Sequence, residues 1–130
     1  MGERRTGSGE KGREFIKTTS YSRLSTIQLM YKLTAFFTKP ESIEAFDAHY
    51  DSVHAPLMRA VPGLQSLVVS RNLRSFGADS PYYLIAEMTF ADRDTFKAAM
   101  ATEENKAAGK DLMSFAAGLV TMVHGEAQEV

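Results

Sequence analysis

The hydrophobic and polar positions of this chain become regular from Met30 onward and predict a succession of strands and helices. Residues 30–37 alternate between apolar and polar side chains, which is the period of a half-buried strand. The side chains on the apolar face of this strand are Tyr31, Leu33, Ala35 and Phe37. Residues 41–57 repeat apolar residues every three or four positions, as an amphipathic helix does. Its apolar positions are Ile43, Phe46, Tyr50, Val53 and Leu57.

Pro56 lacks a backbone N–H, so we expect it to end or kink this helix near Ala55. Pro62 and Gly63 then form a turn signal. Residues 64–73 are rich in β-branched and apolar residues on both predicted faces, as in a strand that is covered on both sides. Simple alternation places Leu64 and Val68 on one face. It places Leu67, Val69 and Leu73 on the other.

The pattern continues with a loop, a strand, a helix in two pieces and a last strand. Residues 77–81 are predicted to form a loop, and residues 82–90 a third strand. Asp92 and then Thr102 are suitable caps for a second helix in two pieces, which Gly118 ends, and residues 119–126 form the last strand. The order β-α-β-β-α-β predicts a ferredoxin-like α+β fold, with a four-stranded antiparallel sheet and helices on one face.

The sheet face without helices should also carry apolar side chains, because the strand over residues 64–73 is apolar on both predicted faces. An uncovered apolar face on a globular protein indicates a partner. Since most oligomers are symmetric pairs, we expect a homodimer that forms through the sheet faces.

Residues 1–29 differ from this domain in composition. They contain six Lys/Arg and three Asp/Glu among several glycines, and few large apolar residues. Such a segment cannot build a core of its own, so we expect a disordered extension before a domain over residues 30–130. It could be residues added in cloning, the result of a start codon placed too early, or a genuine tail. A basic arm for nucleic acid is disfavoured because acidic residues dilute the charge.

Composition excludes several kinds of site. The chain has no cysteine, so disulfides, thiolate metal sites and cysteine nucleophiles are ruled out, and a reducing cytoplasm is the expected location. A net charge of −1 does not favour nucleic acid, and no apolar run is long enough to span a membrane. No phosphate loop or dinucleotide fingerprint is present, and we expect no cofactor.

His49 and His54 are the side chains in the first helix best suited to proton transfer. They are five positions apart, which on an α-helix is about 140° around the axis. Relative to Phe46 they fall on opposite flanks of the apolar stripe, so we expect no shared metal site. His49 lies nearer the stripe and is the better candidate for chemistry, although a histidine that only packs its ring fits equally. His54 lies beside the predicted kink, where its ring is suited to satisfy freed backbone groups, and His124 should lie at an edge or the surface.

Tyr50 lies on the apolar face of the helix, so its hydroxyl needs a buried partner or a cavity. A pocket between helices and sheet would suit a small apolar or aromatic ligand. The side chains expected to contact it are Tyr31, Phe46, Val53 and Met88. Ordinary core packing explains each of them as well. Asp111 lies near the end of the second helical region, where a carboxylate is usually solvated.

These motifs resemble the EthD family. The similarity rests on Phe46-Asp-Ala-His-Tyr50, on Val53-His-Ala-Pro-Leu57 and on Pro62-Gly-Leu64, and continues with Asp111, Phe115 and Gly118. It spans residues 30–126. It implies a dimeric α+β barrel with a small pocket in each subunit, in which His49, Tyr50 and His54 face or support the pocket with Asp111 nearby. It also implies an accessory role in ether or xenobiotic degradation beside an oxygenase system.

Two functions from different classes follow. The first is a cofactor-free enzyme that acts on a small aromatic or carbonyl metabolite, such as an isomerase, dehydratase or monooxygenase, with His49 moving a proton. The second is a non-catalytic module that binds a hydrophobic metabolite and delivers it to a partner oxygenase. A purely structural dimer partner without a pocket is a third reading, and a cavity beside His49 would separate it from the other two.

Overall fold

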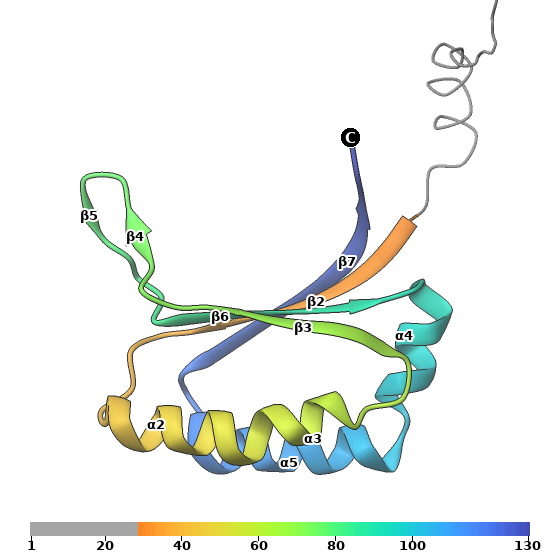
Figure 1. Ribbon diagram of the computed structural model, residues 1–130, viewed down its shortest axis with the longest axis horizontal. Coiled ribbons are helices and arrows are strands. Elements are labelled where there is room, and N and C mark those ends of the chain that lie inside the picture. Colours follow the sequence, from red (N-terminus) through yellow and green to blue (C-terminus); the bar gives the residue numbers. More distant parts are fainter. Residues whose placement is uncertain (1–28) are drawn as a thin grey trace, which may run out of the picture. The chain divides into compact units, whose positions relative to one another are not determined.

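The computed structural model describes residues 29–130, which form a four-stranded main sheet with the helices packed on a single side (Figure 1). The expected extension lies outside the described residues, apart from Leu29, which belongs to the first strand. In chain order the elements are β2 (Leu29–Phe37), α2 (Ile43–His49), η1 (Tyr50–His54), α3 (Ala55–Arg59), β3 (Leu64–Ser70), β4 (Arg74–Ser75), β5 (Ala78–Asp79), β6 (Leu84–Phe90), α4 (Arg93–Met100), α5 (Glu103–Ala116) and β7 (Val120–Gln128).

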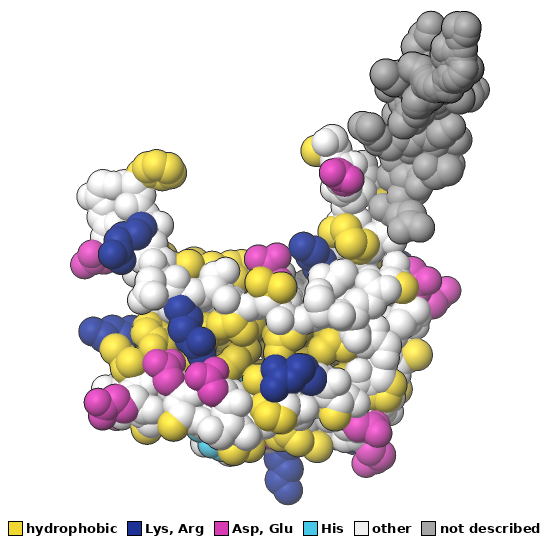
Figure 2. Space-filling model, viewed as in Figure 1, with side chains coloured by type: hydrophobic (Ala, Val, Ile, Leu, Met, Phe, Trp, Pro, Cys, Tyr) yellow, Lys and Arg dark blue, Asp and Glu magenta, His cyan; other side chains and the backbone are white. Residues whose placement is uncertain are grey.

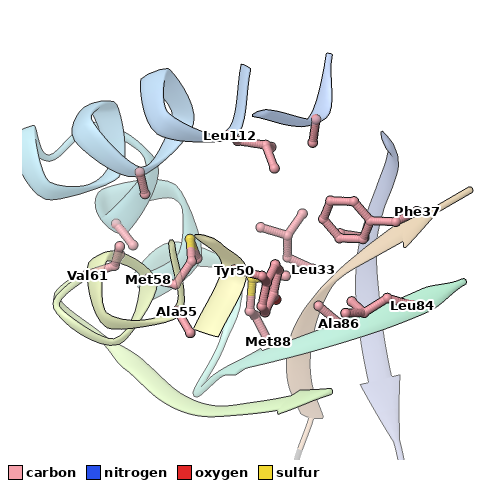
Figure 3. Packing of buried hydrophobic residues seen from close by; sticks show 14 of the residues in the cluster. Leu33, Phe37, Tyr50, Ala55, Met58, Val61, Leu84, Ala86, Met88 and Leu112 are labelled. Atoms are coloured by element: carbon pink, nitrogen blue, oxygen red, sulfur yellow. The ribbon is translucent and has the colours of Figure 1, made fainter. Parts of the chain in front are cut away.

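The main sheet has the strand order β3-β6-β2-β7. The central strand β6 pairs antiparallel with β2 on one side and with β3 on the other. This is the predicted ferredoxin-like α+β fold, with a four-stranded antiparallel sheet and the helices on one face (Figure 1). Alternate residues of β2 and β6 are buried beneath the helices, as the period-two pattern predicts. They include Leu33, Phe37, Leu84 and Met88, which Figure 3 shows pointing into the core.

The first helical segment continues through Pro56 to Arg59, so of the two expected outcomes, an end or a kink near Ala55, the end is wrong. Five residues, η1, adopt a π-helical turn that ends at His54, two residues before the proline. The N–H of Ala55 bonds to the carbonyl of Tyr50, which is the i→i+5 bond of a π-helix. One turn of the helix is thus wider than an α-helical turn, and the helix does not end there.

The π-helical turn also moves the buried stripe by about one position. On a regular α-helix Val53 would follow Tyr50 into the core, but Val53 is 40% exposed. His54, Ala55 and Met58 take the buried positions instead. A π-helical turn holds one extra residue compared with an α-helical turn, and this explains the shift.

Strand β3 contains a β-bulge between Leu64 and Ser66, where the register with β6 shifts. The bulge places one extra residue in β3, so the faces change from one side of it to the other. Leu64 therefore packs against the core together with Leu67 and Val69. The prediction that Leu64 shares a face with Val68 is wrong for this reason, and Val68 remains on the outer face at 54% exposure.

The predicted loop over residues 77–81 contains part of a small β-hairpin. Strands β4 and β5 pair antiparallel, and Ser75 faces Ala78 across a two-residue turn. Gly77 has φ 77° there, a conformation that glycine adopts without strain. The hairpin stands away from the sheet on the side opposite the helices, and Phe76 at its turn is fully exposed (Figures 1 and 2).

Polar contacts fasten the first helical segment to the strands. The Tyr83 hydroxyl donates to Asp47 Oδ2 at 2.7 Å, and Arg71 donates to Asp51 Oδ1 at 2.8 Å. Basic and acidic side chains lie beside one another over the hydrophobic surface on this side (Figure 2). Ser42 caps the start of α2 by accepting from the N–H of Ala45. These contacts hold the π-helical turn in place against the sheet.

Candidate functional site

A cavity of about 390 Å³ lies between the helices and the sheet. This volume is in the range of small-molecule sites. Its walls are mainly apolar and come from β2, β6, η1, α3, α4, α5 and β7. Figure 3 shows Leu33, Phe37 and Met88 from the strands and Leu112 from α5 reaching toward this interior. The polar residues that line it are Tyr50, His54, Asn105 and His124.

Tyr50 is 1% exposed, and its ring packs edge-on against Phe37. Among residues 29–130 the hydroxyl has no hydrogen-bond partner, and the residue lines the cavity. The sequence predicted either a buried partner or a cavity for this hydroxyl, and the structure has a cavity there. Burial raises the pKa of Tyr50 to about 12, so its hydroxyl stays protonated and can donate a hydrogen bond to a ligand.

His54 lines the same cavity and is 4% exposed. Its Nδ1 lies 3.1 Å from Asp111 Oδ2. Because a carboxylate can only accept, Nδ1 carries a hydrogen in this pair, and the neutral ring has a free lone pair on Nε2. Burial lowers the pKa of His54, although the hydrogen bond to Asp111 and the charge of Asp111 act in the opposite direction. The neutral, basic form of the ring is therefore favoured.

His49 contacts the other oxygen of the same carboxylate, with 2.8 Å between Nε2 and Asp111 Oδ1. The prediction that His49 and His54 lie on opposite flanks of the helix is therefore wrong. It assumed 100° per residue, whereas the π-helical turn between them brings residues five apart toward one side. His49 does not line the cavity, and its side chain is 32% exposed.

Asp111 is the centre of this cluster. Its side chain is 14% exposed. The expectation that this carboxylate is solvated, which rested on its helix position alone, is therefore wrong. Phe115, one turn further along α5, packs against both imidazoles, with ring centroids 4.5 Å from His49 and 5.3 Å from His54. The carboxylate and the ring of α5 together fix the orientation of both histidines.

His124 lies on the edge strand β7 and is exposed, as the sequence predicted, but it also borders the cavity. Its Nδ1 is 2.8 Å from the Tyr31 hydroxyl. Asn105, in the first turn of α5, is the other polar lining residue that sequence reasoning missed. No local pattern marks either residue, because only the packing of β7 against α4 and α5 brings them to one cavity.

The four residues that were expected to contact a ligand have different surroundings. Met88 lines the cavity. Tyr31 is buried and does not line the cavity, but it contacts two residues that do, His124 and Phe96. Phe46 is buried in the core beside Tyr50, and Val53 is exposed; neither lines the cavity.

Within residues 29–130, no group of three or more histidine and carboxylate side chains has an arrangement suited to a metal ion. No helix in this part of the chain is both long and apolar enough to cross a membrane.

Solved structures with low sequence identity share the fold. A dimeric ferredoxin-like protein of unknown function from Thermobifida fusca is 16% identical, with a TM-score of 0.57 over 78% of this chain and 92% of that one. SnoaB, a cofactor-independent oxygenase from Streptomyces nogalater, is 19% identical, with a TM-score of 0.51 over 78% of this chain and 93% of that one. Both confirm the ferredoxin-like architecture.

Two other proteins are more similar in sequence. An EthD family protein from Bacillus halodurans C-125 is 45% identical, with a TM-score of 0.72 over 75% of this chain and 98% of that one. An uncharacterised 11.0 kDa protein from the thcB-thcC intergenic region of Rhodococcus erythropolis is 30% identical over 101 residues, which are 78% of this chain and 98% of that protein. The family model of the EthD domain matches residues 38–118. The chain therefore belongs to the EthD family, as its motifs indicated.

Proposed function

We propose that this protein binds a small, neutral, largely apolar carbonyl compound in the cavity and transfers a proton to and from the carbon beside the carbonyl. The observation that carries the proposal is the pairing of His54 with Asp111 next to the hydroxyl of Tyr50, which has no partner among residues 29–130. The rings of Tyr50 and His54 are 5.4 Å apart, so one ligand can contact both. Among residues 29–130, no Lys, Arg, Asp or Glu lines the cavity, which favours a neutral ligand.

Each polar side chain has a role in this reaction. His54 Nε2 accepts the proton from the α-carbon, and the electron pair of that C–H bond forms the enolate. The Tyr50 hydroxyl donates to the carbonyl oxygen, where negative charge develops. Asp111 holds the His54 ring and stabilises the imidazolium that forms. Return of the proton to carbon completes an exchange or an isomerisation without a cofactor.

The geometry favours His54 over His49 as the proton acceptor, which differs from the sequence-based choice. His54 lines the cavity, whereas His49 contacts Asp111 from outside it. In this proposal His49 is a positioning residue that fixes the carboxylate. The cofactor-independent oxygenase of the same fold is consistent with chemistry that side chains alone support.

Deuterium exchange tests the proposal with 2-tetralone as the probe. The protein is expected to accelerate exchange of the tetralone α-protons in D2O, followed by proton NMR. His54→Asn and Tyr50→Phe should each slow the protein-dependent exchange by about 100-fold or more, since one general base or one oxyanion donor contributes that much. Thermal melts of both variants establish that they are folded.

Lys110→Gln, at an exposed α5 residue outside the cavity, is the control and should exchange like the wild type. Binding of 2-tetralone without acceleration would overturn the catalytic role and support a carrier that delivers an apolar metabolite to a partner oxygenase. Loss of exchange in His49→Asn with full exchange in His54→Asn would overturn the assignment of the base.

A further inference from the structure

The cavity has a second group of polar side chains, separate from His54 and Tyr50. His124 holds the Tyr31 hydroxyl through Nδ1, and its ring lies against Phe96 with centroids 4.9 Å apart. With the Tyr31 hydroxyl as donor, the hydrogen of the neutral His124 ring is on Nε2. Asn105 donates from Nδ2 to the Met100 carbonyl at 3.2 Å. This contact leaves Asn105 Oδ1 as an acceptor. One free donor and one free acceptor thus belong to this group.

The two groups lie at different depths. Tyr50 and His54 are almost completely buried, whereas His124 is exposed and Met122 beside it is 42% exposed. The exposed lining residues mark the mouth of the cavity and the buried ones its inner end.

The spacing of residues along helix α5 gives the approximate distance between the two polar groups of the cavity. Asp111, which holds His54, and Asn105 are six residues apart on α5, or about 9 Å along the helix axis at its usual rise. Ala108 and Leu112 line the wall on this helix and are apolar. A ligand that reaches both groups must therefore have an elongated apolar body.

We infer that the ligand carries a second polar group, a neutral hydroxyl, at the end opposite its carbonyl, and that His124 at the mouth recognises this hydroxyl. The inference rests on the proposed function, since the carbonyl end is placed by Tyr50 and His54. A hydroxyl can accept from His124 Nε2 and donate to Asn105 Oδ1, which satisfies both free groups. A carboxylate or ammonium group at this end would meet no Lys, Arg, Asp or Glu, because none of these in the described part of the chain lines the cavity.

A matched pair of probes tests this. 2-Tetralone and 6-hydroxy-2-tetralone differ only in a hydroxyl at the end of the molecule opposite the carbonyl. NMR titrations of the wild-type protein should show the hydroxylated probe bound about three- to tenfold more tightly, the effect of one net hydrogen bond. His124→Phe keeps a ring against Phe96 but has no nitrogen, and the ratio of the two dissociation constants should fall close to one. Lys110→Gln should keep the wild-type ratio.

The outcomes separate this inference from the proposed function. Equal affinity of the wild-type protein for the two probes, or a preference that persists in His124→Phe, would overturn the role of His124 and leave the proton-transfer proposal standing if exchange is seen. Failure of both probes to bind would overturn the proposed function, and this inference with it.

Discussion

His54, Asp111 and His49 together show how surroundings set the properties of single side chains. One carboxylate accepts from both rings, and their side-chain exposures rise from 6% for His54 through 14% for Asp111 to 32% for His49. Burial keeps His54 neutral at the cavity, while the carboxylate orients it. The same residue types on a solvated helix would have no such division of roles.

The lowered pKa of His54 predicts a pH-dependent stability. The unfolded chain takes up a proton near the ordinary histidine pKa of 6.5, whereas the folded chain does so only at lower pH. The unfolded state therefore binds more protons in this window, so the free energy of unfolding falls as pH drops from about 6.5 to the lowered pKa, below which the loss stops. Urea unfolding from about pH 7 to about pH 5 should show this decline in the wild type and a smaller one in His54→Asn.

A decline of the same size in His54→Asn and the wild type would contradict this origin. Asp111→Asn provides an independent check, because the hydrogen bond and the charge of Asp111 both raise the pKa of His54. Removing the charge should lower that pKa further, and the proton NMR signal of the His54 ring measures it directly. A rise in the pKa would contradict the assignment.

At the scale of elements, two local irregularities decide which side chains reach the site. The π-helical turn η1 brings His54 inward and His49 to the same carboxylate. The bulge in β3 turns Leu64 toward the core and leaves Val68 outside. Each inserts one extra residue into a regular pattern, and each reverses a face assignment that simple periodicity makes.

The turn that joins α3 to β3 depends on Gly63. Gly63 has φ 87°, and a Cβ there would lie 2.8 Å from Thr95 Cγ2. Gly63→Ala is therefore expected to lower the free energy of unfolding by roughly 1–3 kcal/mol, from backbone strain and the clash. Gly109→Ala, in α5 with no atom within 4 Å of the added Cβ, should instead raise it by up to about 1 kcal/mol. Urea unfolding measures both, and equal effects in the two variants would contradict the argument.

At the scale of the whole molecule, the outer face of the sheet carries exposed apolar side chains. Val68 and Val123 are 54% and 53% exposed, and Val68 lies on this face opposite Glu87 of β6. Solved proteins of the same fold from Bacteroides fragilis and Thermobifida fusca are described as dimeric. We propose that two copies of this chain associate through these faces. Because Leu64 faces inward, the apolar contribution of β3 to this surface comes from Val68.

Sedimentation velocity at micromolar concentration tests the dimer. The wild type should sediment as a dimer of 14.4 kDa chains. Val68→Asp should dissociate it, because an unpaired carboxylate would be buried between the sheets. Ala107→Asp introduces the same charge at an exposed residue on the helical side and should remain a dimer. A monomeric wild type, or a dimeric Val68→Asp, would contradict association through this face.

Much of the fold could be predicted because periodicity is a local property. Alternation identified β2 and β6, the caps Asp92 and Thr102 identified α4 and α5, and the order of elements implied the ferredoxin-like sheet. The family motifs could be recognised for the same reason, and the resemblance indicated His49, Tyr50, His54 and Asp111 together as site residues. Each of these inferences needed only residues that are near one another in the chain.

The tertiary structure alone decided how these residues meet. An apolar stripe does not reveal a one-residue change in helical phase. Val53 and His54 both suit the buried position that follows Tyr50, and only packing selects one of them. The contact of Asp111 with both histidines and the place of His124 at the cavity join segments more than fifty residues apart. Sequence determined the elements and the chemical groups, and long-range packing determined which groups share one cavity.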